Sequence, residues 1–298
     1  MTGQDMSEAA DIERASMRRS FEQAAAAYDE AAVLQREVGT RLLERLDYIR
    51  FAPARILDAG AGTGFCQQQL AARYPAAEIH ALDIAPGMLC QARGKSGWLR
   101  RLKRRDRFVC ADVQALPYAG ESMDMIVSNL TLQWCLNPEA VFGEWRRVLK
   151  PGGLLLFTSF GPDTLKELRQ CWSKVDAYTH VNNFADMHDL GDAMLRAGFS
   201  DPVMDMEMIT VTYEDVLGIM RDLKQIGAHN VTRGRARGLT GKGRLQGLRQ
   251  AYEEYRRQGR LPVSHEVLYG LAWRGENRPG KQVEVAFPSV MPTPGRKP

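Results

Sequence analysis

The chain has 298 residues, of which 44% are hydrophobic, so it can bury the core of one large or two small globular domains. Its 40 basic and 36 acidic residues give a formal net charge of +4, which argues against binding to nucleic acid or to a membrane surface through overall charge. The five cysteines stand singly, without metal-ligand spacing, so we expect neither a metal site nor a disulfide framework.

The first predicted element is a helix over residues 11–48, which Pro53 ends. Five apolar residues fall on one stripe at helical spacing: Val33, Leu34, Val38, Leu42 and Leu46. The residues before this helix lack the apolar run of a signal peptide, and no later segment has the length of a membrane span. We therefore expect a cytoplasmic protein without a membrane partner.

Short apolar runs alternate with helical patterns from there to about residue 160. The predicted strands are 54–59, 77–83, 107–113, 123–129 and 153–160, with helices near 65–73, 86–93 and 138–149. This alternation predicts parallel strands with right-handed crossovers, and hence a doubly wound α/β sheet.

The pattern changes near residue 200. Two late strands, 203–213 and 265–273, are expected to run antiparallel to the others, and helical patterns near 213–226 and 244–257 lie between them. With these strands the sheet has seven members and is mostly parallel. The predicted domains are a helical lid (1–50), a catalytic domain (51–275) with helical insertions near 161–198 and 213–257, and a flexible tail (276–298).

The stretch ILDAGAGTGFC follows the first strand, where open α/β sheets bind their ligands. Gly60, Gly62 and Gly64 let the backbone turn sharply and let a ligand approach it closely. A dinucleotide pattern would need Gly or Ala where this chain has Phe65, so a pyrophosphate is disfavoured. The carboxylate of Asp58 suits a ligand with positive centres, such as S-adenosylmethionine (SAM). The alternative is a turn that only packs helix against strand.

Polar residues also end the next strands. Asp83 can accept both ribose hydroxyls of SAM, Asp112 can accept the adenine amino group, and Asn129 lies beneath the methionine moiety. Apolar neighbours of the two aspartates suit the adenine ring. The predicted SAM site consists of Asp58, Gly60, Gly62, Gly64, Asp83, Ile84, Met88, Asp112, Val113 and Asn129.

These strand ends, with VLKPGGLLLFTS before and into the fifth strand, resemble the class I SAM-dependent methyltransferases over about residues 50–160. Longer segments, among them TSFGPDTLKELRQCW and MRDLKQIGAHNV, resemble the malonyl-acyl-carrier-protein O-methyltransferase family over about residues 18–255. The resemblance implies methylation of the free carboxylate of malonyl-acyl carrier protein, or of malonyl-CoA, at the start of pimeloyl and biotin synthesis. A carboxylate is already anionic at neutral pH, so we expect no catalytic base.

The acceptor site is predicted from placement in this family type. Tyr28 and Phe184 are expected as lid aromatics, Gln133 and Trp134 as the floor, and Arg221 and Lys224 as cations opposite the malonyl carboxylate. Each has a structural alternative: core aromatics for Tyr28 and Trp134, a hydrophobic staple for Phe184, and a solvated helix face for the two cations.

Two basic stretches, 95–107 and 233–244, could steer an acidic acyl carrier protein to the enzyme, because opposite charges raise association rates. A solvated surface is the alternative for both. Nucleic acid ranks low, because SNLTLQWCLNP lacks the Asn-Pro-Pro-Tyr type of motif that amino-methylating nucleic-acid enzymes use.

Two other functions remain open from the sequence. One is SAM-dependent methylation of another small molecule, such as carbon methylation of a quinone precursor. The other is a methyltransferase-like assembly factor that binds a protein partner through its basic stretches.

Overall fold

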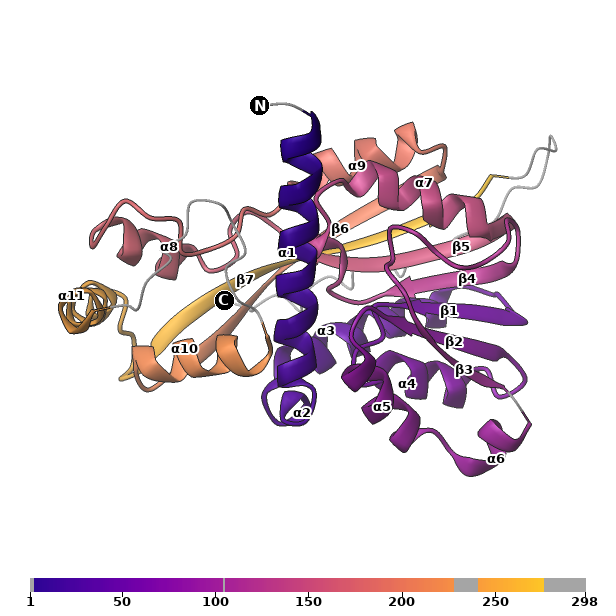
Figure 1. Ribbon diagram of the computed structural model, residues 1–298, viewed down its shortest axis with the longest axis horizontal. Helices are drawn as coiled ribbons and strands as arrows, with labels where there is room; N and C mark the ends of the chain where they lie inside the picture. Colours follow the sequence, from indigo (N-terminus) through magenta and orange to yellow (C-terminus); the bar gives the residue numbers. More distant parts are fainter. Residues whose placement is uncertain (1–2, 104, 228–240, 276–298) are drawn as a thin grey trace, which may run out of the picture.

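The computed structural model describes residues 3–103, 105–227 and 241–275. These residues form a seven-stranded sheet in the order β3-β2-β1-β4-β5-β7-β6 (Figure 1). The strands are β1 (Arg55–Ala59), β2 (Glu78–Asp83), β3 (Asp106–Cys110), β4 (Met123–Ser128), β5 (Leu149–Phe160), β6 (Ser200–Tyr213) and β7 (Leu261–Trp273). The predicted doubly wound α/β fold is confirmed, and so are all seven predicted strands.

Strands β1 to β5 pair in parallel, whereas β7 is antiparallel to both of its neighbours, β5 and β6. The reversal of strand order between β1 and β4 creates the switch point at which open α/β sheets bind ligands. The carboxyl ends of β1, β2 and β4 therefore form the edge on which a site is expected.

The helices cover both faces of this sheet. They are α1 (Gly3–Ala24), α2 (Tyr28–Ala31), α3 (Val33–Glu44), α4 (Phe65–Arg73), α5 (Pro86–Lys95), α6 (Trp98–Leu102), α7 (Pro138–Val148), α8 (Lys166–Ser173), α9 (Met187–Arg196), α10 (Val216–Gln225) and α11 (Lys242–Glu253). Short 3₁₀ turns follow α3 at Arg45–Tyr48 and β4 at Leu132–Trp134. Local sequence signals explain where α7 begins. The side chain of its N-cap residue, Asn137, accepts a hydrogen bond from the Ala140 N–H at 3.1 Å, and Pro138 is the first residue of the helix.

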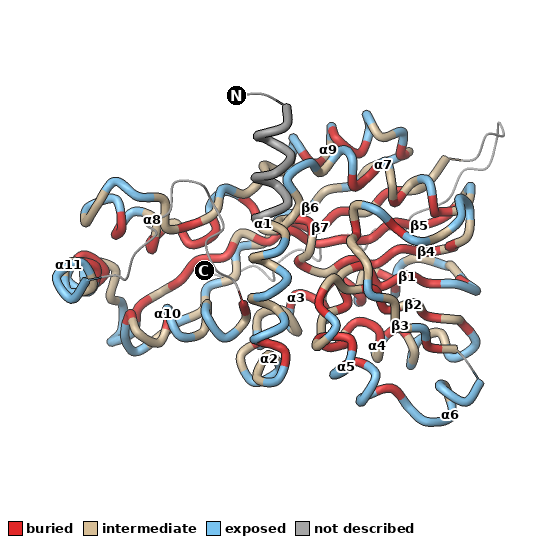
Figure 2. The backbone as a smooth tube through the Cα atoms, viewed as in Figure 1, coloured by how far each residue is buried: buried red, intermediate tan, exposed pale blue. Residues whose placement is uncertain are grey.

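Three hydrophobic clusters hold the layers together. Helices α7 and α9 pack on one face of the sheet, around Trp145 and Phe157, while α3 and α4 pack on the other, around Leu42 and Ile56. The outer ends of the long strands β6 and β7 carry a third cluster with α8, α10 and α11. Figure 2 shows the resulting pattern, with the central strands buried and the outer helix faces exposed.

The amino-terminal region differs from the single predicted helix. The chain leaves helical geometry after Ala24 and again at Ala32, so α1, α2 and α3 are separate. Alanine favours helix, so the break comes from tertiary packing: Ala24 and Ala25 are buried against Ala85 and Met88. Val33, predicted on the buried stripe, is 63% exposed, whereas Val38, Leu42 and Leu46 are buried as predicted.

Candidate functional site

Two abutting cavities lie at the carboxyl edge of the sheet, beneath α1. The larger has an empty volume of about 630 Å³ and the smaller one of about 450 Å³, both including open solvent. Four residues line both of them: Tyr28, Gly60, Gly62 and Asn129. Of the ten residues predicted to hold SAM, eight line the larger cavity, and Asp58 lines the smaller one. The tenth, Gly64, lines neither.

The three glycines of the turn serve different purposes. All three have positive φ: +81° at Gly60, +53° at Gly62 and +85° at Gly64. A Cβ on Gly60 would lie 2.0 Å from Thr131 Oγ1, and one on Gly64 would lie 2.8 Å from the Cβ of Ala92, whereas one on Gly62 would meet no atom within 4 Å. Gly60 and Gly64 therefore permit close packing, which was the alternative interpretation of the turn. Gly62 leaves open space in the cavity.

Asp58 presents a buried oxygen without a partner. Its side chain is 1% exposed, and its Oδ2 forms no hydrogen bond with the described residues. Burial raises the pKa of this carboxyl to about 7, with a further contribution from Asp83, while a backbone bond from Gln67 acts in the opposite direction. In the same cavity Gln35 Oε1 is also buried and unpartnered among the described residues, and Arg36 adds a cation.

Asp83 closes the second strand and holds the glycine turn. Its Oδ2 accepts the Gly62 N–H and its Oδ1 the Ala85 N–H, each at 2.9 Å. Burial raises the pKa of this carboxyl, and the two N–H donors limit the rise. Ile84 and Met88 line the same cavity, so the carboxylate and its predicted apolar neighbours are brought together.

Asp112 lies just beyond β3 and is already in contact with α1. Its Oδ1 accepts the Gln114 N–H at 2.8 Å, and its Oδ2 lies 3.8 Å from Arg14 Nε. Arg14 also donates to Gln114 Oε1 at 3.4 Å. The predicted adenine-side carboxylate therefore also anchors the amino-terminal helix.

Asn129 is fixed in orientation by hydrogen bonds on both sides of its amide. Its Nδ2 donates to the carbonyl of Gln35 at 2.9 Å, and its Oδ1 accepts from Thr158 Oγ1 at 2.8 Å. The first of these bonds ties β4 to α3. Asn129 thus links the boundary between the cavities to the amino-terminal region.

Comparison with known proteins identifies the family. Residues 57–157 match the family described as methyltransferase domain. The malonyl-[acyl-carrier protein] O-methyltransferase of Gallionella capsiferriformans is 55% identical over 88% of this chain and 91% of its own length. The protein of the same description from Laribacter hongkongensis is 54% identical over 94% of this chain and 95% of its own. The chain belongs to the malonyl-[acyl-carrier protein] O-methyltransferase family. The resemblance inferred from the sequence is confirmed.

A solved structure agrees with the fold of this methyltransferase. The YcgJ protein from Bacillus subtilis superposes with a TM-score of 0.54 at 15% identity, covering 79% of this chain and 97% of its own. Within the described residues, no His, Cys, Asp or Glu side chains gather in groups of three that could hold a metal ion. None of the described helices is both long and apolar enough to cross a membrane.

Of the six residues predicted to bind the acceptor, two line the larger cavity and four line neither cavity. Tyr28 and Trp134 line the larger cavity. Gln133 lines neither cavity: its Nε2 donates to the carbonyl of Leu130 at 2.7 Å, so it supports the loop. Phe184 packs against Phe160, with ring centroids 5.7 Å apart, also outside both cavities.

Arg221 and Lys224, the predicted counter-cations of the acceptor, are exposed on α10 and line neither cavity. The structure therefore does not bring them to the position where a malonyl carboxylate would meet the methyl donor. The solvated helix face, which was the structural alternative for this pair, agrees with their exposure.

Sequence reasoning missed the α1 side of the cavity. Met17 and Phe21 line the larger cavity, and the ring of Phe21 meets that of Trp134. Their spacing of four residues is the signal for one helix face, but it does not say which surface that face covers. Gln35 and Arg36 line the smaller cavity and were missed as well, because the sequence around them was predicted only to form a helix.

Proposed function

We propose that this methyltransferase transfers a methyl group from SAM to the free carboxylate of a malonyl group carried as a thioester on acyl carrier protein. The proposal that SAM is the methyl donor rests on one observation. Asp58 has a buried oxygen with no hydrogen-bond partner among the described residues, and its cavity abuts a second one lined by Asp83 and Asp112. The acceptor follows from relatives that are 54% and 55% identical and are described as malonyl-[acyl-carrier protein] O-methyltransferases. As the resemblance implies, the methyl ester would enter pimeloyl and biotin synthesis.

The donor set of the two cavities fits SAM. In the smaller cavity Asp58 and Gln35 offer oxygen acceptors to an ammonium group, and Arg36 offers a cation to a carboxylate. In the larger cavity Asp83 would accept the ribose hydroxyls, and Ile84, Met88 and Val113 would contact the adenine ring. Gly62 keeps the backbone accessible between these two ends.

The residues common to both cavities would surround the reacting centre. When bound, SAM supplies an electrophilic methyl group on a sulfonium. The acceptor carboxylate is ionised at neutral pH, so the protein needs to orient it and exclude water and has no proton to remove. Tyr28 is suited to shielding this point, because it borders both cavities, and burial raises the pKa of its hydroxyl above the ordinary value and keeps it neutral.

We assign the lid role to residues 1–50. Besides the contacts of Arg14 with Asp112 and Gln114, further polar contacts tie this region to the site: Glu22 accepts the Gly87 N–H at 2.8 Å, Thr63 donates to Asp29 at 2.5 Å, and Asn129 donates to Gln35 as described. These contacts are polar and local, so they can break and re-form as cofactor and product exchange. The cytoplasmic location stays a prediction.

A labelled methyl-transfer assay tests the proposal. Purified protein is incubated with methyl-labelled SAM and with malonyl-acyl carrier protein, acetyl-acyl carrier protein or malonyl-CoA. Label should enter the malonyl species alone and be released by mild base as methanol. SAM binding without label in any malonyl species would contradict the proposal and favour another acceptor or an assembly role.

A further inference from the structure

Helix α1 forms part of the wall of the larger cavity and packs against the end of α10. Met17 and Phe21 of α1 line the cavity. Gly227, just beyond α10, packs on the same turn: a Cβ built there would lie 3.1 Å from Phe21 Cδ1 and 3.3 Å from the carbonyl oxygen of Ser20. The two helices therefore meet at the turn of α1 that lines the cavity, and Figure 1 shows them side by side.

Four exposed cations lie on the two helices that meet at this junction. Arg18 and Arg19 follow Met17 directly on α1, and Arg221 and Lys224 lie on α10. Lys224 is one turn from the junction, since its carbonyl accepts the Gly227 N–H at 3.1 Å. None of the four forms an ion pair with another described residue. We call them the basic rim.

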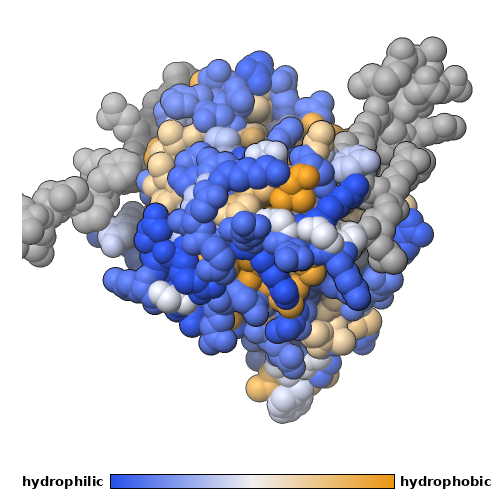
Figure 3. Space-filling view, turned by 90° about the vertical axis from the view of Figure 1, so that its left-hand side faces the viewer, coloured by the Kyte–Doolittle hydropathy of each residue, from blue (hydrophilic) through white to orange (hydrophobic). Residues whose placement is uncertain are grey.

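The surroundings of the rim suit a protein partner. Met220, next to Arg221, is 36% exposed and adds an apolar contact among the cations. Figure 3 views the molecule from the side on which α8, α10 and α11 lie, and hydrophilic residues dominate this face, with small apolar patches between them. The predicted basic stretch 233–244 continues the sequence beyond Gly227, but most of it lies outside the described residues.

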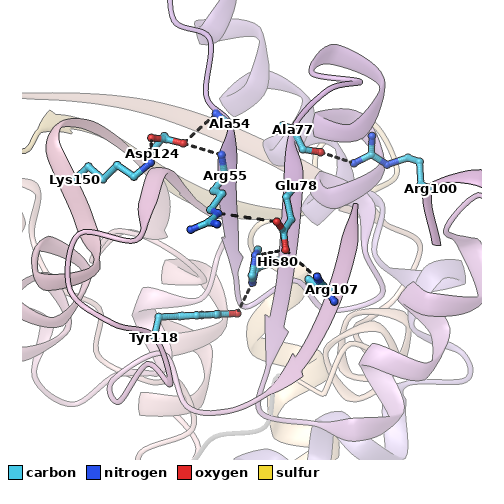
Figure 4. Close-up of polar contacts among 10 residues, drawn as sticks. All are labelled: Ala54, Arg55, Ala77, Glu78, His80, Arg100, Arg107, Tyr118, Asp124 and Lys150. Atoms are coloured by element: carbon cyan, nitrogen blue, oxygen red, sulfur yellow. Dashed lines mark hydrogen bonds and ion pairs between the residues drawn. The ribbon is translucent and has the colours of Figure 1, made fainter. Parts of the chain in front are cut away.

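Most of the other basic stretch, 95–107, lies at the amino ends of the strands, although Lys95 pairs with Asp29, which lines the smaller cavity. Arg100 donates to the carbonyls of Pro75 and Ala77, and Arg107 pairs with Glu78 at 2.9 Å, at the amino end of β2 (Figure 4). The cavities open at the carboxyl ends of the strands. A carrier held at this stretch would face the wrong edge, and three of its arginines are already engaged: Arg100, Arg105 and Arg107.

We propose that the acidic carrier protein docks on the basic rim, through Arg18, Arg19, Arg221 and Lys224. The inference rests on the proposed function and assigns the partner's place on the surface. The charges are complementary, and exposed cations that form no ion pair with another described residue can steer an acidic partner without first breaking internal ion pairs. Arg18 follows Met17 directly on α1, so a carrier docked there would lie beside the cavity wall that Met17 helps to form.

Charge reversal on each helix tests the docking surface. We would prepare Arg221→Glu/Lys224→Glu and Arg18→Glu/Arg19→Glu, with Arg101→Glu/Lys103→Glu, in α6 and directly after it, as the matched control, because both control residues are exposed. Each is assayed with malonyl-acyl carrier protein and with the malonyl thioester of N-acetylcysteamine, which lacks a protein and phosphates. Thermal denaturation verifies that each variant is folded, and glutamine versions replace any that is not.

The rim variants should raise the KM for the carrier substrate about tenfold or more and flatten its dependence on salt, while the rate with the small thioester stays within about twofold. The α6 control should leave both substrates unchanged. An unchanged KM in both rim variants, or an equal loss with both substrates, overturns the docking site alone. A wild-type enzyme that methylates neither malonyl substrate overturns the proposed function and this inference with it.

Discussion

Phe21 of α1 meets Trp134 edge to face, with ring centroids 5.3 Å apart and ring planes at 90°. Both rings line the larger cavity, so this pair joins α1 to the loop that follows β4. An edge-to-face arrangement places the positive ring edge against the negative ring face, which makes it attractive beyond the area that it buries.

Removing this contact should loosen the hold on SAM. Loss of an aromatic pair costs about 0.5–1.5 kcal/mol, so Phe21→Ala should raise the SAM dissociation constant about two- to twelvefold. Stopped-flow measurement should show the change mainly in the dissociation rate. Tyr48→Ala is the control, because that ring is 56% exposed and lines neither cavity. Equal effects of the two substitutions would argue against a lid function for Phe21.

Two neighbouring glycines should respond differently to alanine. In Gly60→Ala the new methyl group would lie 2.0 Å from Thr131 Oγ1, so the melting temperature should fall steeply. In Gly62→Ala the methyl group enters open space, and the fold should bear only the left-handed backbone cost of about 1–2 kcal/mol while SAM affinity falls sharply. Calorimetric melting and titration of the two variants separate the effects. A Gly62→Ala protein with native affinity would show that no ligand occupies this space.

Asp83 should be essential for cofactor affinity. Substitution by alanine removes the acceptor for the ribose hydroxyls as well as the bonds to Gly62 and Ala85, so the SAM dissociation constant should rise about tenfold or more. Asp83→Asn retains one acceptor oxygen and should give an intermediate value. Isothermal titration with both variants measures this order, and an unchanged constant in Asp83→Ala would remove this residue from the site.

The raised pKa of Asp58 predicts that SAM binding is linked to proton release. With a pKa of about 7, against an ordinary value of 3.8, the carboxyl retains its proton in the free protein at mildly acidic pH. A bound ammonium favours the carboxylate, so binding should release a proton below about pH 7, and affinity should increase with pH up to that value. Titrations in two buffers of different ionisation enthalpy measure the release. The Asp58→Asn variant should bind more weakly, with no such release.

The raised pKa of Asp58 also determines how the stability of the SAM-free protein changes with pH. The folded state binds the proton of the Asp58 carboxyl more tightly than the unfolded state does. The contribution of this proton to the free energy of unfolding is therefore fully present below about pH 3.8 and is lost as the pH rises to about 7. Asp58→Asn should remove that dependence. A wild-type protein whose Asp58-dependent stability increases over this interval would contradict the assignment.

The strand ends could be predicted because local pattern and topology agree there. Alternating apolar runs mark β1 to β5, and parallel strands bring Asp58, Asp83 and Asn129 to one edge whatever the details of packing. That is why nine of the ten predicted cofactor residues line the two cavities.

Residues outside the strand ends could not be placed in this way. The break after Ala24 depends on contacts with Ala85 and Met88, which are distant in sequence. Once α1 and α3 separate, Phe21 and Arg36 turn toward the cavities, and no periodicity predicts this. Arg221 and Lys224 illustrate the converse, since a basic helix face has the same pattern whether it faces a substrate or solvent.

The position of β7 has a consequence for biogenesis. This strand is the last of those that the structure describes, yet it lies between β5 and β6, so among the described strands β6 has no hydrogen-bonded neighbour until residues up to Trp273 are available. During translation β6, and the side of β5 that later pairs with β7, would remain unpaired while α10 and α11 are synthesised. A nonsense mutation before Leu261 would thus leave an aggregation-prone sheet even though every cavity residue had been made.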